Sequence, residues 1–584
     1  MTAPAAHSAA DLELTMRAST TLPKGAMLAI ALVQGILLYL LYHAFDTDVW
    51  PSKSPVWSYP LWTLALAVPL LVLLSINRDN TLAVVKQVGA FALVLALVAV
   101  YAGWQAEPFN EFPVSSLSFA FGFSMTLACF KALMYLQQRA DRVPLSYQVL
   151  FTNSWRNFLV GALSAVFVLV FWLILVLWGQ LFKVIEIDFF KELFEEDWFL
   201  IPVLSVAFGL GVIIFRDLTN VIDSITKLLH WLIKVLLPLV VAVAVIFLAA
   251  LPVVGLGVLW STGRGTGLLL WLLAVMLFFT NAVYQDGREA KPYPKIIHRM
   301  IFSGLCVMPI VSALSFYGLS LRIEQYGWSV ERCWAFVVWL ILSLFAIGYV
   351  WGIIRRRDNW TNDLARVNTG MGLVVLAIML LANSPLLDFR KISLHSQLGR
   401  VESGEIELGD FDFWYAKHNL ARPGYLAMEK MKQDIGDSDP GLLARIESPA
   451  YPARNISIEM AEQMWTNMLY RPEPFEIPVA LKPMLETSIG MIENATPVII
   501  RSDLDDDGQD EYLLLTVHEY GIGYSQFYYL TNDGSRAGNV VYTSWQRNAG
   551  AQKKTLEEGE IELVEPRFKH IKIGEITLKP TSND

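Results

Sequence analysis

The chain has 584 residues, of which 54% are hydrophobic and only 17% are charged, and its mean hydropathy is +0.44. Soluble domains carry roughly 25% charged residues, so the composition indicates a membrane protein. The formal net charge of −9 argues against nucleic acid as a partner, because phosphate binding needs a basic surface.

The charge is distributed unevenly between an apolar body and an acidic tail. From Arg390 onward the chain has 20 Lys and Arg against 31 Asp and Glu, which leaves 25 against 23 in the first 389 residues. The three cysteines, Cys129, Cys306 and Cys333, all lie in or beside apolar runs, so the tail cannot form a disulfide. The first 23 residues are polar and mixed in charge, and the first apolar run is too long for a signal-peptide core. We therefore expect a cytoplasmic N-terminal segment (1–24) and an uncleaved first span.

Eleven apolar runs are long enough to cross a bilayer, which takes about 20 residues of helix. They cover 25–45, 57–76, 85–104, 115–136, 157–182, 198–215, 232–260, 267–285, 299–320, 333–353 and 368–387. The seventh run carries Pro238 and Pro252, so we expect a kink or an extension of this helix into the cytoplasm. The sequence predicts a transmembrane helical domain over 25–387.

The loops between the spans differ in positive charge. With the N-terminus inside, the cytoplasmic segments hold 18 Lys and Arg and the opposite loops hold 6, and the alternation holds at every loop. Cytoplasmic loops are the ones enriched in Lys and Arg. Because eleven is odd, the tail is expected outside the cytoplasm. We expect the inner membrane of a bacterium with two membranes, and a periplasmic tail.

Two segments beside the spans have an interfacial composition. Ile185–Leu200 is acidic and aromatic, and Asp217–Lys234 has helical apolar spacing. Each could lie flat in the lipid headgroups or pack as an amphipathic helix on neighbouring spans. Inside the spans we expect Lys131, His230 and Asn281 to serve packing. No Asp or Glu lies near the middle of a run, which weakens the case for a carboxylate-driven antiporter.

The tail begins with Leu387–Lys432, in which strand or loop is expected until a helix starts near Arg422. Helical spacing returns at Ser457–Tyr470 and Val479–Met491. From Pro497 the pattern changes to strands, with a hairpin turn at Thr531–Ser535. The expected strands cover 497–502, 511–520, 525–531, 539–545, 560–566 and 570–578. We therefore expect a juxtamembrane, mainly helical segment (388–495) and a soluble, β-rich α+β domain with an antiparallel sheet (496–584).

The start of the tail carries a recognisable set of residues: Ser393, Ser396, Gln397, Leu398, Arg400, Gly404, Asp410, Phe411, Asp412, Phe413 and Tyr425. With these residues it resembles the bacterial membrane-protein family known as domain of unknown function 4153. The resemblance covers about residues 20–435, includes Gly179–Phe194 and the pattern of apolar spans, and leaves out the last 150 residues. It implies a multi-span membrane protein, and no activity can be carried over from it.

The tail contains a turn, Arg501–Leu515, in which five of the first ten residues are aspartates. Calcium loops place carboxylates at positions 1, 3 and 5, glycine at 6 and another ligand at 9. Such a cluster would repel itself strongly without a cation. The alternative is a solvated acidic hairpin turn, since Asp and Gly are common in turns. Position 12 is Leu514 and strands flank the loop, so this is not an EF-hand. The predicted calcium ligands are Asp503, Asp505, Asp507, Gln509 and Glu511, with Gly508 permitting the turn.

Catalytic motifs are scarce, because the chain has no HExxH, no GxSxG and no Walker loop. The regions around His395 and around His418 are the only clusters of candidate catalytic side chains, and we expect both to be places where the tail packs on the membrane body. We therefore predict transport or envelope maintenance of a lipid-like or envelope molecule, with membrane lipids as partners and the tail as an outer cap. The alternative is a membrane-anchored protein that binds an envelope partner or senses divalent cations.

Overall fold

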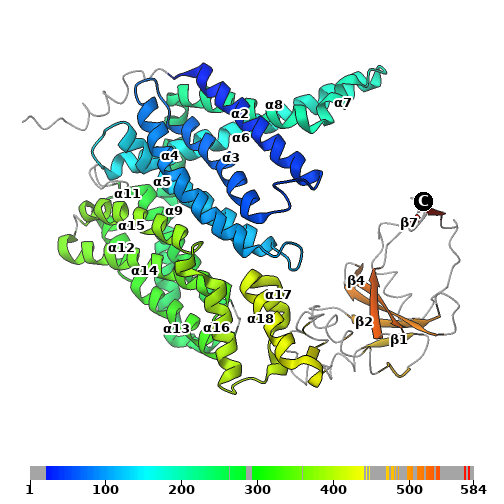
Figure 1. Cartoon of the computed structure of the whole chain (residues 1–584). Helices are drawn as coiled ribbons and strands as arrows, with labels where there is room; N and C mark the ends of the chain where they lie inside the picture. The colour runs from blue at the N-terminus through cyan, green and yellow to red at the C-terminus, as the bar shows by residue number, and fades with distance from the viewer. Residues whose placement is uncertain are drawn as a thin grey trace, which may run out of the picture. The chain divides into compact units, whose positions relative to one another are not determined.

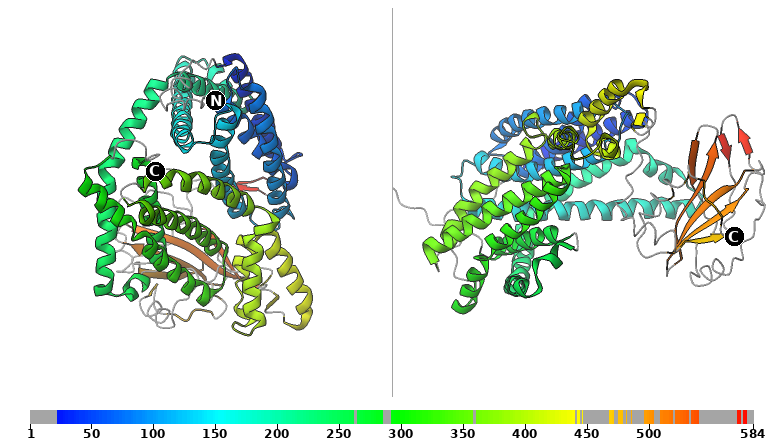
Figure 2. Two further views of the ribbon diagram at one scale, coloured as in Figure 1. Left: turned by 90° about the vertical axis from the view of Figure 1, so that its left-hand side faces the viewer. Right: turned by 90° about the horizontal axis from the view of Figure 1, so that it is seen from below.

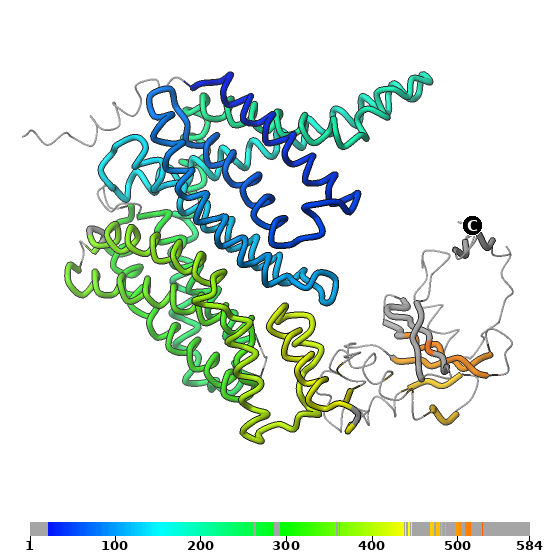
Figure 3. The backbone as a smooth tube through the Cα atoms, in the orientation of Figure 1, coloured from blue at the N-terminus to red at the C-terminus, as the bar shows by residue number. Residues whose placement is uncertain are grey.

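A computed structural model gives the fold of most of the chain (Figures 1 and 3). It describes residues 22–261, 264–284, 292–357, 360–439, 442–443, 446, 468–471, 475–478, 481, 485, 496–503, 509–518, 521–531, 534–539, 571–573 and 576–578. The chain divides into two compact units, Met1–Glu447 and Ser448–Asp584. The first unit is helical throughout its described residues, and the described regular structure of the second is mainly β-strand.

The first half of the helical unit forms one group around a shared apolar core. In this group α2 packs on α8, α3 packs on α4, and α6 packs on α8. Its core includes Met27, Leu73, Val88, Val160 and Val212, all almost fully buried. The helices are α2 (Lys24–Asp46), α3 (Pro55–Ser75), α4 (Thr81–Gln105), α5 (Ser115–Ala140), α6 (Tyr147–Val184), α7 (Phe189–Glu195) and α8 (Asp197–Asp217).

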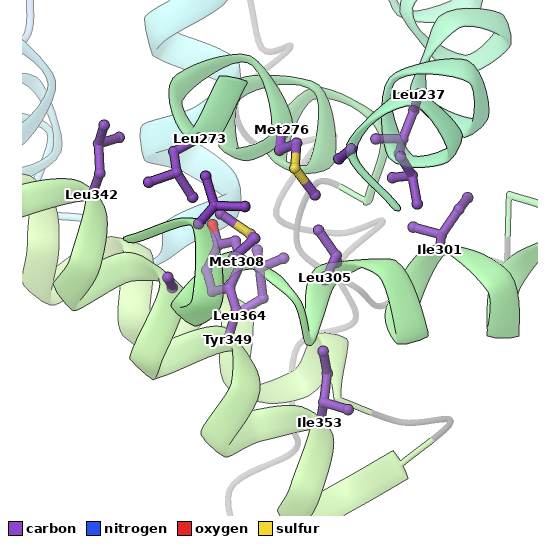
Figure 4. Close-up of a cluster of buried hydrophobic side chains, with 14 of the residues drawn as sticks. Leu237, Leu273, Met276, Ile301, Leu305, Met308, Leu342, Tyr349, Ile353 and Leu364 are labelled. Carbon is purple, nitrogen blue, oxygen red and sulfur yellow. The ribbon is translucent and has the colours of Figure 1, made fainter. Parts of the chain in front are cut away.

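The second half forms another group with its own core. Leu237, Leu273, Met276, Ile301 and Tyr349 converge from four helices and are almost fully buried (Figure 4). A third core, to which α4, α5, α14 and α15 contribute, joins the two groups. Figure 2 shows the helices from two further sides. The helices of this half are α9 (Thr219–Val254), α10 (Leu256–Ser261), α11 (Gly265–Tyr284), α12 (Lys295–Leu305), α13 (Met308–Tyr326), α14 (Val330–Arg356) and α15 (Thr361–Leu381).

Eleven helical segments of the described chain are long and apolar enough to span a membrane, and each contains or overlaps one of the eleven predicted runs. The chain is therefore a multi-pass membrane protein. The seventh span, α9, begins at Thr219, so it includes the amphipathic segment, whose Ile222 packs in the first core. The other predicted interfacial segment holds α7, whose Phe190 and Phe194 rings lie 5.3 and 5.8 Å from that of Trp178 on α6. Both segments thus pack on neighbouring helices.

The ninth span differs from its prediction because it is broken. α12 ends at Leu305 and α13 begins at Met308. Pro309, the second residue of α13, has no backbone N–H and cannot continue the hydrogen bonding of the preceding helix. The two pieces together still cover Lys295–Tyr326.

Three juxtamembrane helices follow the last span: α16 (Phe389–Glu402), α17 (Phe413–Asn419) and α18 (Ala421–Ile435), with short 3-10 turns at Pro385–Leu387, Leu408–Asp410 and Gly436–Ser438. The expectation of strand or loop before Arg422 was wrong, because α16 and α17 are helices. The Asp388 side chain accepts a hydrogen bond from the Arg390 backbone N–H and so starts α16. The helix expected near Arg422 is confirmed as α18.

The second unit contains a five-stranded sheet in the order β1-β2-β3-β4-β5. The expected antiparallel pairing is confirmed from β2 to β5, and β1 adds a parallel pair with β2, so the sheet as a whole is mixed. Ile499, Leu514 and Tyr528 form its buried core. The strands are β1 (Leu469–Arg471), β2 (Thr496–Ser502), β3 (Glu511–His518), β4 (Gly521–Thr531) and β5 (Gly534–Asn539), and β6 (Ile571–Ile573) pairs with β7 (Ile576–Leu578).

Most described strands lie where the alternation predicted them. The turn at Thr531–Ser535 is confirmed, because Thr531 pairs with Gly534. The helix expected over Ser457–Tyr470 is wrong at its end, where Leu469 and Tyr470 belong to β1. The strand at 560–566 lies outside the described residues, as does nearly all of the helix at Val479–Met491 and of the strand at 539–545.

Candidate functional site: an apolar groove below the juxtamembrane helices

A groove of about 570 Å³ lies between α3 and α5 and reaches Leu41 and Phe45 of α2. We call it the α3–α5 groove. Its lining on α3 runs from Pro55 to Leu74, which is about 28 Å of helix at 1.5 Å per residue. That length is close to the roughly 30 Å hydrocarbon core of a bilayer. The groove therefore runs along most of the depth of a membrane.

The wall of the groove is apolar even where its residues carry hydroxyl groups. Thr63 Oγ1 donates a hydrogen bond to the Tyr59 carbonyl at 2.7 Å, and Thr126 Oγ1 donates to the Gly122 carbonyl at 2.8 Å. Both hydroxyls are thus satisfied within their own helices. A Cβ atom at Gly122 would meet no atom within 4 Å, so the groove is open there. Such a surface suits a hydrocarbon chain better than a polar solute.

One end of the groove carries the polar groups. At the start of α3, the Tyr59 hydroxyl lies 2.6 Å from the Ser118 hydroxyl of α5, which closes the gap between the two helices. The Tyr59 ring also packs on Phe121, with 5.7 Å between ring centroids. This is the end at which α3 and α5 begin and α4 ends, and we call it the juxtamembrane end because α16–α18 pack there.

Asp388 organises the juxtamembrane end and is only 4% exposed. Its Oδ2 accepts hydrogen bonds from the Tyr101 hydroxyl and from Gln105 Nε2 of α4, each at 2.6 Å. Its Oδ1 accepts from the Arg390 backbone N–H at 3.0 Å. One carboxylate therefore ties the end of α4 to the start of α16.

The Arg390 side chain lies beside this carboxylate and is 8% exposed. Its charge interacts with Asp388, Tyr59, Tyr101 and Tyr415. Burial lowers the pKa of its guanidinium, and the charge of Asp388 raises that pKa in part. Because arginine stays protonated in proteins, the site holds a buried positive charge near the Asp388 carboxylate.

α18 packs over the end of α4 and the loop after it. Arg422 Nη1 donates a hydrogen bond to the Glu107 carbonyl at 3.1 Å, and its guanidinium lies 4.7 Å from the Trp104 ring. Tyr425 packs on Phe112 of the same loop, with 5.8 Å between ring centroids. Ala106 and Val114 of this region border both the groove and α18.

The polar motif residues of α16 have a structural use. Ser393 Oγ donates to the Trp328 carbonyl, and Gln397 Nε2 donates to the carbonyls of Tyr326 and Trp328. Ser396 Oγ accepts from the Trp328 backbone N–H. These side chains hold α16 against the loop between α13 and α14. His395 is exposed, and His418 bonds and stacks within its own helix.

A second polar cluster lies among α11, α14 and α15. Asn281 Oδ1 lies 2.8 Å from the Tyr349 hydroxyl and 3.3 Å from the Tyr147 hydroxyl, and it also accepts from Asn368 Nδ2. His230 packs between Phe151 and Trp155. The expected packing role is therefore seen for both residues. Asn281 forms hydrogen bonds to neighbouring helices, and His230 packs between aromatic rings.

The predicted calcium turn joins two paired strands, since Ser502 of β2 pairs with Glu511 of β3. Asp505 and Asp507 lie outside the described residues, so the five expected ligands cannot be compared as a set. An ion pair of 3.4 Å joins Arg501 to Asp510 at the base of the turn. Within the described chain no group of three His, Cys, Asp or Glu side chains is placed to hold a metal ion. The calcium site stays a prediction.

Sequence reasoning missed the groove and the buried ionic residues at its end. Tyr59 and Tyr101 are far from Asp388 and Arg390 in sequence, and none of the four belongs to a motif. One signal in the sequence could have pointed to them. Asp388 and Arg390 follow directly on the last apolar run, and a charged pair in that position is exposed unless another segment covers it.

The comparisons with known proteins identify a family but no activity. The sequence model described as Domain of unknown function (DUF4153) matches residues 62–431. No curated protein and no solved structure matches the chain.

Proposed function

The chain belongs to the DUF4153 family, and from that premise we propose that it binds and handles a lipid-like amphiphile in the membrane. The observation that carries this proposal is the α3–α5 groove, which is apolar along a membrane-length stretch of α3 and polar at one end. An amphiphile has the matching division into an apolar chain and a polar headgroup. The role in the cell would be transport or envelope maintenance.

The location of the site follows from the proposed orientation. The excess of Lys and Arg in alternate loops favours a cytoplasmic N-terminus, which puts the juxtamembrane end on the opposite side. In a bacterium with two membranes, α16–α18 and the β-rich unit would then lie in the periplasm, above the outer leaflet of the inner membrane. The headgroup would be taken from, or delivered to, that leaflet.

A groove-filling variant tests the proposal. Gly122→Trp places a large side chain in the open space of the groove, whereas Gly89→Trp makes the same change at an exposed α4 position that does not line it. The full chain is reconstituted in lipid nanodiscs, released into detergent, and examined by native mass spectrometry. We expect the parent and Gly89→Trp to retain a lipid that Gly122→Trp loses. Equal lipid retention in all three proteins would contradict the proposal.

A second candidate function rests on the aspartate turn, whose composition favours a divalent-cation-binding or cation-sensing role. Calorimetric titration of the full chain with calcium tests it, with a double variant Asp503→Ala and Asp505→Ala as control. We expect heat at a stoichiometry near one in the parent chain only. A rise in its melting temperature would show that calcium braces the fold. Absence of heat at millimolar calcium would contradict calcium binding, and the segment would then be a solvated hairpin turn.

A further inference from the structure

The charge of Arg390 has no carboxylate within ion-pair distance among the described residues. Asp388, the nearest acidic group on its own segment, directs both oxygens elsewhere: one to Tyr101 and Gln105, the other to a backbone N–H. Arg390 Nε is buried and has no hydrogen-bond partner within the described chain. One N–H of a side chain that is only 8% exposed is therefore without a partner among the described residues.

Such an arrangement is costly unless a partner arrives. A buried charge that is neither paired nor hydrogen-bonded carries a large desolvation penalty. A guanidinium presents planar pairs of N–H donors that match the oxygens of phosphate and carboxylate groups. The missing partner is thus expected to be an anion with oxygen acceptors.

Arg390 does not itself line the groove, but the chain next to it packs with a residue that does. Tyr59 lines the α3–α5 groove, bridges to Ser118, and packs against the same apolar core as Phe389, the residue before Arg390. The charge of Arg390 also interacts with Tyr59. The Tyr101 and Tyr415 hydroxyls also interact with this charge, and they donate hydrogen bonds to Asp388 and Glu331. A molecule whose apolar chain lay between α3 and α5 would bring its headgroup to this end.

We propose that Arg390 binds the anionic headgroup of a phospholipid-like amphiphile whose acyl chain occupies the α3–α5 groove. This inference rests on the proposed function and adds the class of ligand. The headgroup accepts hydrogen bonds from the guanidinium, while the apolar wall excludes water from the chain. A zwitterionic lipid fits less well, because its cationic group would be brought near the guanidinium, which has the same sign of charge.

The test measures headgroup preference with a matched charge control. The full chain is placed in nanodiscs made of equal parts phosphatidylglycerol and phosphatidylcholine, and the lipid retained in detergent is identified by native mass spectrometry. Arg390→Gln removes the buried charge. Lys391→Gln removes the same charge from the next residue, which is exposed and lies 5.8 Å from the Tyr101 ring.

The parent chain is expected to enrich phosphatidylglycerol about tenfold over phosphatidylcholine, the size of effect expected from one hydrogen bond to a buried charge. Arg390→Gln should remove the enrichment and Lys391→Gln should keep it. Loss of enrichment to the same extent in both variants would overturn the inference, as would a parent chain without preference. If Arg390→Gln does not fold, Arg390→Lys keeps the charge but loses the planar fork, and undiminished enrichment in it would also overturn the inference.

The two proposals fail in distinguishable ways. If the Gly122→Trp variant retains as much lipid as the parent, the groove does not hold the ligand and the proposed function fails. If Gly122→Trp loses the lipid but the lipid shows no headgroup preference, the groove binds an amphiphile and only the role of Arg390 fails.

Discussion

At the scale of single residues, the polar motif of α16 serves docking. Ser393, Ser396 and Gln397 all bond to the backbone of the loop between α13 and α14, and Gly327 in that loop has a φ of +69°. Glycine reaches this left-handed region without strain and commonly ends a helix in it. The motif thus satisfies the backbone groups of a helix end and attaches the juxtamembrane helices to the spans.

Gln397→Leu should destabilise this attachment. The side-chain amide bonds the Tyr326 carbonyl at 2.9 Å and the Trp328 carbonyl at 3.0 Å, and its loss should cost about 1–3 kcal/mol. The melting temperature of the full chain in detergent should fall. His395→Ala, an exposed position on the same helix, is the control and should change it little. Equal melting temperatures for Gln397→Leu and the parent would show that these bonds contribute nothing.

The residues of the candidate site were not predictable from the sequence, whereas the motif residues around them were. The motif is local, so Ser393 to Arg400 could be recognised by their spacing. The site is assembled from α3, α4, α5 and α16, and the contact of Tyr101 with Asp388 joins positions 287 residues apart. A contact at that separation depends on how the spans pack, and the periodicity of one segment does not predict it.

At the scale of the elements, close packing of α3 and α4 shapes one side of the groove. Gly103 is buried in α4, and a Cβ atom there would overlap the carbonyl of Pro55. Small residues at such contacts let the backbones of membrane helices approach closely. The position of α3 relative to α5 therefore depends on a glycine that does not itself line the groove.

Gly103→Leu should force α3 away from α4. We expect a large fraction of the variant to elute as aggregate in size-exclusion chromatography and the remainder to lose the bound lipid. Gly89→Leu makes the same change in the same helix where a Cβ atom meets nothing within 4 Å, and it should behave as the parent does. A monodisperse Gly103→Leu protein that retained lipid would refute the role given to this contact.

The spans were the most predictable elements and the juxtamembrane helices the least. Eleven long apolar runs have few alternatives to transmembrane helix, because a bilayer offers no partner for unpaired backbone groups. α16 was missed because the side that faces the α13–α14 loop carries Ser393, Ser396 and Gln397, so helical apolar periodicity is weak. In the ninth span Pro309 was visible, but a proline can bend or break a helix, and its surroundings decide which.

At the scale of the whole molecule, topology decides on which side of the membrane the site opens. The juxtamembrane end gathers the start of α14 as well as the end of α4 and the start of α5, because the Tyr415 hydroxyl bonds the Val330 backbone N–H and the Glu331 carboxylate. Two loops counted as non-cytoplasmic from their low Lys and Arg content, the one after α4 and the one between α13 and α14, therefore both contact the juxtamembrane helices. For these two loops the charge pattern and the packing agree.

Fusions at the C-terminus test the predicted side. Alkaline phosphatase, which is active only outside the cytoplasm, should be active after Asp584, and green fluorescent protein, which folds in the cytoplasm, should not fluoresce there. The same reporters placed in the loop between α3 and α4, which carries Arg78, should give the opposite result. A fluorescent C-terminal fusion would invert the orientation and move the site to the cytoplasmic leaflet.

The central claim is that the α3–α5 groove holds an anionic amphiphile with its headgroup at Arg390. Electron cryomicroscopy of the full chain in phosphatidylglycerol nanodiscs tests this claim most directly. We predict continuous elongated density along α3 from Leu74 towards Tyr59, ending in a larger feature within hydrogen-bonding distance of the Arg390 guanidinium. A groove closed by its own side chains, or an Arg390 paired with a carboxylate of the chain, would contradict the account.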